Sequence, residues 1–175
     1  KSMRFFYQFV YGLPLHTVIT LIGMLYIAWY SLKQKLQQKK KPDLKLWTLL
    51  CVVTLSCWIG CVLYITLITR NCGVYSYHLI PFHQLQALLC GANPEILRSA
   101  WMNIILFVPG GLLLSELLLK NGHFRMKLLF IISILAVFSA GIEIGQWYWQ
   151  LGCAEIDDVI CNLLGTIIGL LIYLH

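Results

Sequence analysis

The chain has 175 residues, of which 59% are hydrophobic and 11% are charged, and its formal net charge is +6. Soluble domains carry roughly a quarter charged residues, so this composition excludes a water-exposed globular surface and indicates lipid as the main solvent. The positive charge does not indicate nucleic-acid binding. Six lysines lie in one short segment between two apolar runs, where they suit anionic lipid headgroups: Lys33, Lys35, Lys39, Lys40, Lys41 and Lys45.

Five apolar runs approach the length of about 20 residues that a membrane-spanning helix needs. They are residues 10–32, 46–69, 101–119, 128–150 and 159–174. The first run is too long for a signal-peptide core, and its bases follow it rather than precede it, so we expect it to be retained. The last run is short and would span with local bilayer thinning. The sequence therefore predicts an all-α, polytopic transmembrane helical bundle of about five helices.

Lysine and arginine are divided unevenly between the connecting segments. The connections after the first and third predicted helices hold nine of them, and the segments on the other side hold four. Because cytoplasmic loops carry the excess of bases, we expect an N-outside, C-inside arrangement. The segment 70–100 and the acidic turn 152–158 would then face the exterior.

Polar residues interrupt the last three predicted helices near their expected outer ends. Helical periodicity places them on one stripe of each helix, so they could meet inside the bundle. In the last helix Asp157 points away from this stripe. The stripe residues are Asn103 in the third helix, Glu143 and Gln146 in the fourth, and Glu155, Asp158 and Asn162 in the fifth.

A purely structural interpretation of these residues stays open. Gly165 and Gly169 form a G-x-x-x-G pair that permits close helix packing, and the amides could be interhelical hydrogen-bonding groups. Asp158 could be the N-cap of the last helix. Glu143 fits this interpretation least, because a carboxylate inside an apolar helix persists when it is paired, protonated or functional.

The outer segment contains weaker signals. His78 and His83 do not share a helical face, so we interpret them as interfacial polar residues rather than metal ligands. A proline followed by an acid predicts a short surface helix over 94–100 that leads into the third span. Cys72 and Cys90 could form a disulfide if they face an oxidising exterior, or remain free thiols.

Four motifs in order resemble the VanZ-like family of bacterial membrane proteins. They are residues 79–82 (LIPF), 103–113 (NIILFVPGGLL), 143–146 (EIGQ) and 155–165 (EIDDVICNLLG). The resemblance covers about 77–171, so we divide the chain into two N-terminal helices with a basic loop (1–70) and a VanZ-like core (71–175). The family often has Asp where this chain has Glu155, with Arg shortly before it. Arg98 is the candidate to replace that arginine.

The resemblance implies a multi-pass protein of the bacterial plasma membrane that is associated with resistance to teicoplanin-type glycopeptides. One hypothesis is an outward-facing site that binds or modifies a lipid-linked envelope component. Glu143 and Asp158 would be catalytic. The substrate-binding residues would be Asn103, Gln146, Glu155, Asn162 and Arg98. A divalent cation such as magnesium, calcium or manganese could be held by Glu143, Glu155 and Asp158. The alternative is a non-catalytic protein that binds or translocates a drug or lipid, or that is structural.

Overall fold

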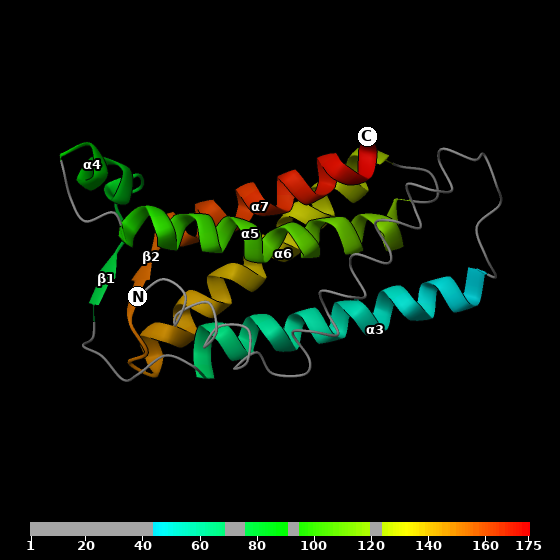
Figure 1. Cartoon of the computed structure of the whole chain (residues 1–175), viewed down its shortest axis with the longest axis horizontal. Coiled ribbons are helices and arrows are strands. Elements are labelled where there is room, and N and C mark those ends of the chain that lie inside the picture. The colour runs from blue at the N-terminus through cyan, green and yellow to red at the C-terminus, as the bar shows by residue number, and fades with distance from the viewer. Residues whose placement is uncertain (1–43, 69–75, 91–94, 120–123) are drawn as a thin grey trace, which may run out of the picture. The chain divides into compact units, whose positions relative to one another are not determined.

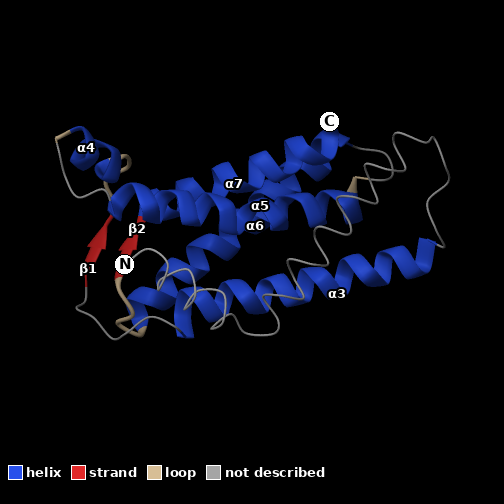
Figure 2. Cartoon of the chain, in the orientation of Figure 1, coloured by secondary structure: helices blue, strands red, loops and turns tan. Residues whose placement is uncertain are grey.

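The computed structural model describes residues 44–68, 76–90, 95–119 and 124–175 (Figure 1). The first predicted span, 10–32, lies outside these residues. Figure 2 shows that helices dominate the described part. The elements are α3 (Leu44–Leu63), the π-helical turn η1 (Tyr64–Ile68), β1 (Ser76–His78), α4 (His83–Leu89), α5 (Glu95–Leu118), α6 (Phe124–Tyr148), β2 (Cys153–Glu155) and α7 (Ile156–Leu174).

Four helical segments in the described part are long and apolar enough to cross a bilayer. They are Lys45–Ile68, Ile96–Leu118, Phe124–Tyr148 and Ile156–Leu174. They correspond to the last four predicted spans, so the prediction of a helical, multi-pass membrane protein is confirmed for this part of the chain. The orientation across the bilayer stays a prediction.

The chain divides into two compact units, Lys1–Cys61 and Val62–His175. In the first unit, α3 buries a regular stripe and exposes apolar residues elsewhere, as a helix in lipid does. The buried stripe is Trp47, Cys51, Thr54, Trp58 and Cys61. Two cysteines of this run, Cys51 and Cys61, therefore pack as small apolar side chains.

In the second unit, α5 is longer than predicted. It runs without interruption from Glu95 to Leu118 and contains Pro109. The prediction of a separate surface helix over 94–100 is therefore wrong, since residues 95–100 form the first turns of the spanning helix itself. Local signals at a helix start cannot distinguish a short helix from the beginning of a long one.

The interface between α5 and α7 depends on three glycines. At each of them an added Cβ would overlap a backbone carbonyl oxygen of the other helix, so the two backbones approach as closely as they can. The pairs are Gly165 with Ile104, Gly169 with Val108, and Gly111 with Thr166. The predicted packing through Gly165 and Gly169 is confirmed. Small residues permit such approach, and in lipid this van der Waals contact is a main source of helix association.

A two-stranded parallel sheet ties the segment before α4 to the segment before α7. Ser76 pairs with Cys153, Tyr77 with Ala154, and His78 with Glu155. The sheet brings residues 76–84 to the end of the helices where α6 ends and α7 begins (Figure 1). This arrangement positions the candidate site.

Candidate functional site

Three carboxylates are buried at the end of the second unit where α6 ends and α7 begins. The exposed fractions are 7% for Glu143, 6% for Asp157 and 5% for Asp158. The N-cap of α7 is Glu155, without a side-chain capping bond, and both aspartates lie in the first turn. Asp158 is therefore not the N-cap. The N-terminal end of a helix dipole favours negative charge, which makes this turn a suitable place for two carboxylates.

Glu155 connects the acids that the sequence grouped together. Its backbone N–H donates to Oε2 of Glu143 at 3.1 Å. Its carboxylate accepts a hydrogen bond from Nε2 of Gln84, which also donates to Oδ1 of Asp158 at 3.1 Å. Glu143, Glu155 and Asp158 thus belong to one hydrogen-bonded group. We call Glu143, Glu155, Asp157, Asp158 and Gln84 the acidic corner.

Asp157 holds the turn over residues 82–84 in place. Its two carboxylate oxygens accept hydrogen bonds from the backbone N–H groups of Phe82, at 2.6 Å, and Gln84, at 2.7 Å. Phe82 has a φ of 63°, which is uncommon for a residue with a side chain. Asp157 does lie off the polar stripe of its helix, but the turn over 82–84 covers it. The sequence interpretation therefore missed both Asp157 and Gln84.

The predicted amides lie deeper or turn elsewhere. Nδ2 of Asn162 donates to Oγ of Ser139 at 2.8 Å. Asn162 lies one helical turn from Asp158 on α7, and Ser139 lies one turn from Glu143 on α6. Nε2 of Gln146 donates to the carbonyl of Thr66 in η1 at 3.2 Å. Within the described part, Nδ2 of Asn103 and Oδ1 of Asn162 are buried without a hydrogen-bond partner. Gln146 is thus directed towards η1, whereas Asn162 extends the polar group along α7.

The remaining predictions for the site concern Arg98, a divalent cation and two histidines. Arg98 is exposed near the start of α5, and its role in place of the family's arginine stays a prediction. Among the described residues, no group of three or more His, Cys, Asp and Glu side chains could hold a metal ion. The cation at Glu143, Glu155 and Asp158 therefore stays a prediction. His78 and His83 stack with ring centroids 4.8 Å apart.

The cysteines near the site also have defined states. Cys90 is an exposed free thiol, and Cys72 lies outside the described residues. Cys153 on β2 is half-buried, and burial is the main cause that raises the pKa of its thiol. The charges of Glu155 and Glu143 raise this pKa further, whereas a hydrogen bond with Ser76 lowers it. Burial, more than the neighbouring carboxylates, thus sets the direction of the change in the pKa of Cys153.

A cavity of about 350 Å³ adjoins the acidic corner. Glu143 and Glu155 contribute to its wall, and the remaining lining residues are apolar or aromatic. They come from β1 and the residue after it, from the last turns of α6, and from β2 and the start of α7. The site therefore combines buried carboxylates with a neighbouring apolar space.

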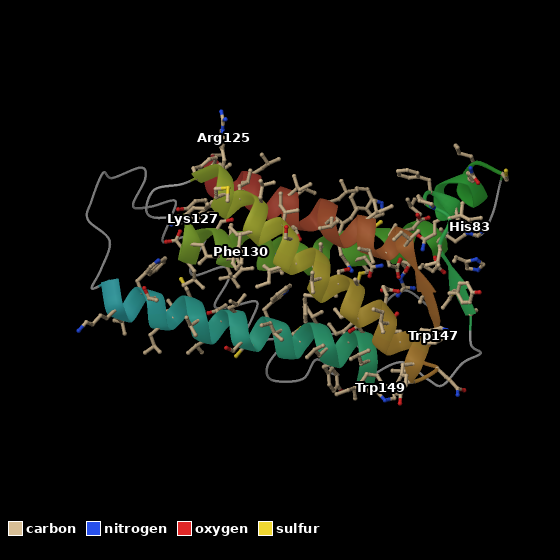
Figure 3. The ribbon with its side chains drawn as sticks, turned by 180° about the vertical axis from the view of Figure 1, so that it is seen from behind. His83, Arg125, Lys127, Phe130, Trp147 and Trp149 are labelled. Atoms are coloured by element: carbon tan, nitrogen blue, oxygen red, sulfur yellow. The ribbon has the colours of Figure 1, made fainter. Side chains whose placement is uncertain are left out.

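The charged ends of the unit are well separated. In Figure 3, Arg125 and Lys127 lie at one end of the α5–α7 part, and His83 and Trp147 lie towards the other. The acidic corner, which contains the neighbour of His83 along the chain, belongs to the second end. The bases Arg125 and Lys127 thus lie at the opposite end of this part from the acidic corner, and which end faces the cytoplasm stays a prediction.

Comparison with known proteins identifies the family. A sequence model described as VanZ/LLP1 matches residues 17–175. The chain belongs to the VanZ/LLP1 family. The match is longer than the stretch 77–171 that carried the resemblance, and it includes the second predicted span and most of the first.

A curated relative is Protein VanZ of Enterococcus faecium. It is 38% identical over 101 residues, which are 58% of this chain and 57% of that protein. The aligned region thus spans little more than half of the length of this chain and of that protein. No solved structure matches the chain.

Proposed function

We propose that this VanZ/LLP1 protein binds a lipid-linked component of the bacterial cell envelope at the acidic corner, on the outer side of the plasma membrane. Through this binding it would lower susceptibility to teicoplanin-type glycopeptide antibiotics. The observation that carries the proposal is the burial of Glu143 near the end of a membrane-spanning helix, hydrogen-bonded to the connection that leads into α7. Ionisable groups in such positions are costly and are commonly functional.

The setting of the corner supports a lipid-linked ligand. Its carboxylates lie beside an apolar cavity, so one ligand could place a polar group at the acids and an apolar part against the cavity wall. The corner also lies at the end away from Arg125 and Lys127 (Figure 3). By the positive-inside rule, that end faces the exterior, where glycopeptides meet the cell-wall precursors.

The hydrogen bonds favour binding over covalent catalysis. An activated serine nucleophile needs a base within hydrogen-bonding distance. Oγ of Ser139 accepts from Asn162, and Oγ of Ser115 donates to the carbonyl of Gly111, so these bonds link neither hydroxyl to a histidine or a carboxylate. A general acid or base role for Glu143 and Asp158 stays a prediction, as does a bound divalent cation.

The test is Glu143→Gln, compared with Glu116→Gln. Glu116 is also buried, with 2% of its surface exposed, and lies near the C-terminal end of α5. The glutamine at 143 can still accept the hydrogen bond from the backbone of Glu155, so the fold should persist while the charge is lost. We expect Glu143→Gln to abolish protection against teicoplanin in a susceptible bacterium, and Glu116→Gln to retain it.

Both variants must reach the wild-type level in the membrane fraction for this comparison to count. Full protection by Glu143→Gln would show that the charge has no role in resistance. Equal loss in both variants would indicate a general requirement for buried acids, and the proposed site would then be abandoned.

A further inference from the structure

The cavity beside the acidic corner has the character of a site for a hydrocarbon chain. Eight of its ten lining residues are apolar or aromatic, and its volume is about 350 Å³. Ala140 and Ala154 are the smallest of them, and they leave space that larger side chains would fill. A concave apolar space of this size is typical of a ligand site rather than of a packing defect.

The two acids in the wall do not make the cavity polar. Glu143 uses Oε2 to accept from the backbone of Glu155, and Glu155 uses Oε2 to accept from Gln84. These oxygens are thus engaged with protein donors. A polar ligand inside the cavity would exchange its hydration for an apolar wall, which is unfavourable. A hydrocarbon chain loses nothing by the same transfer.

The cavity opens beside exposed apolar side chains of α6. Ile144 and Trp147 line it and are themselves 64% and 42% exposed. Tyr77 and Leu79 line it from the other side and are 64% and 66% exposed. Because α6 is long and apolar enough to span the bilayer, these exposed side chains offer a lipid chain an apolar route to the cavity.

The segment that forms the outer wall also suits the bilayer boundary. Ile80 and Phe82 are 67% and 56% exposed, and residues 76–90 contain no Asp, Glu, Lys or Arg. Exposed apolar residues in such numbers mark an interaction surface. In a membrane protein, a charge-free apolar turn beside Trp147 belongs at the level of the lipid headgroups.

We infer that this cavity binds one hydrocarbon chain of a lipid, which enters sideways from the leaflet between Leu79 and Ile144. The chain is either the acyl chain of a phospholipid or the isoprenyl chain of a lipid-linked precursor, since the wall is complementary to both. The inference deepens the proposed function, because the headgroup of that lipid would lie beside the acidic corner. The position of the headgroup rests on the proposed function, whereas the chain site in the cavity does not.

The experiment uses the full chain in nanodiscs of phosphatidylcholine that contain a trace of a photoreactive lipid. One arm contains phosphatidylethanolamine with a diazirine in its acyl chain, and the other contains an isoprenol with a diazirine in its chain, so neither probe brings a net negative charge to the acidic corner. After illumination, mass spectrometry locates the adducts. We expect severalfold enrichment on Ala140, Ile144 and Val159 over Val137, which is 73% exposed on α6 and does not line the cavity.

Ala140→Leu is the decisive variant, and Ala136→Leu, one turn away on α6, is its matched control. Leucine at 140 fills the cavity, so labelling of the cavity-lining residues should fall severalfold in this variant. In the control they should be labelled as in the wild type. Ala154→Leu fills the same space from β2 and replaces Ala140→Leu if that variant does not fold. The arm with the stronger cavity labelling identifies the chain.

Two results would overturn the inference. One is labelling by both lipids that is no stronger in the cavity than at Val137. The other is cavity labelling that Ala140→Leu and Ala154→Leu leave unchanged. Failure here is separable from failure of the proposed function, because Glu143→Gln removes a charge at the acidic corner but keeps the size of a side chain that contributes to the cavity wall. Lost resistance without chain labelling would refute the cavity site and spare the acidic corner.

Discussion

Replacement of Gly165 by alanine should separate α5 from α7. A Cβ at this position would overlap the carbonyl oxygen of Ile104 and would lie 2.9 Å from its carbonyl carbon and 3.2 Å from its Cα. These are backbone atoms, so a change of rotamer cannot relieve the overlap. The helices must move apart, and the neighbouring contact between Gly169 and Val108 opens with them.

The magnitude follows from two opposed effects. Overpacking of a well-packed interior costs about 1–3 kcal/mol, and the rigid backbone neighbour places this site at the upper end. Alanine regains about 1 kcal/mol over glycine inside a helix. Overpacking of about 3 kcal/mol, reduced by this gain, should therefore lower the free energy of unfolding by about 2 kcal/mol. Gly141→Ala is the control, because a Cβ on Gly141 would meet nothing within 4 Å. Its free energy of unfolding should rise by about 1 kcal/mol, which is the difference in helix propensity alone.

The assay is reversible unfolding in mixed micelles with increasing dodecyl sulfate, followed by circular dichroism. Gly165→Ala should unfold at a lower detergent fraction than the wild type, and Gly141→Ala at an equal or higher one. Should Gly165→Ala prove as stable as Gly141→Ala, the close approach of α5 and α7 would not exist in the protein, and the packing argument would be refuted.

Two further predictions concern the corner. Asp157→Asn leaves one acceptor oxygen for the two backbone N–H groups of Phe82 and Gln84. We expect faster amide hydrogen exchange over 82–89, with α6 unchanged; equal exchange in both proteins would show that Asp157 does not hold the turn. Because burial and nearby carboxylates raise the pKa of Cys153, it should be alkylated more slowly than the exposed Cys90 at neutral pH, and the gap should narrow as pH rises. Peptide mapping would measure both rates, and equal rates at neutral pH would contradict the prediction.

Much of the fold could be predicted because lipid imposes simple rules on sequence. The apolar runs fixed the last four spans to within a few residues, since a bilayer requires long uncharged helices. The pair Gly165 and Gly169 indicated the contact surface of the last helix, because little else permits such close approach. Glu143 was expected to turn inward, and it is buried.

The acidic corner could be predicted in part. Periodicity placed Asp158 and Asn162 on one face of the last helix, but it excluded Asp157, whose partners are non-local. Phe82 and Gln84 lie more than 70 positions away along the chain. Helical periodicity concerns neighbouring residues of one helix and does not predict such a contact. The strand pairing that brings them there involves three residues on each side, too few for a recognisable alternation.

The acidic corner and the apolar cavity depend on the same short segment. Gln84 gives its amide hydrogens to Glu155 and Asp158, whereas Leu79, five residues earlier, forms part of the cavity wall. Asp157 holds the turn between them. If this turn moves, Glu155 and Asp158 lose a shared donor and the cavity loses part of its wall in the same step. A substitution that disturbs the turn should therefore affect headgroup and chain binding together. Glu143→Gln and Ala140→Leu, which leave the turn untouched, should separate them.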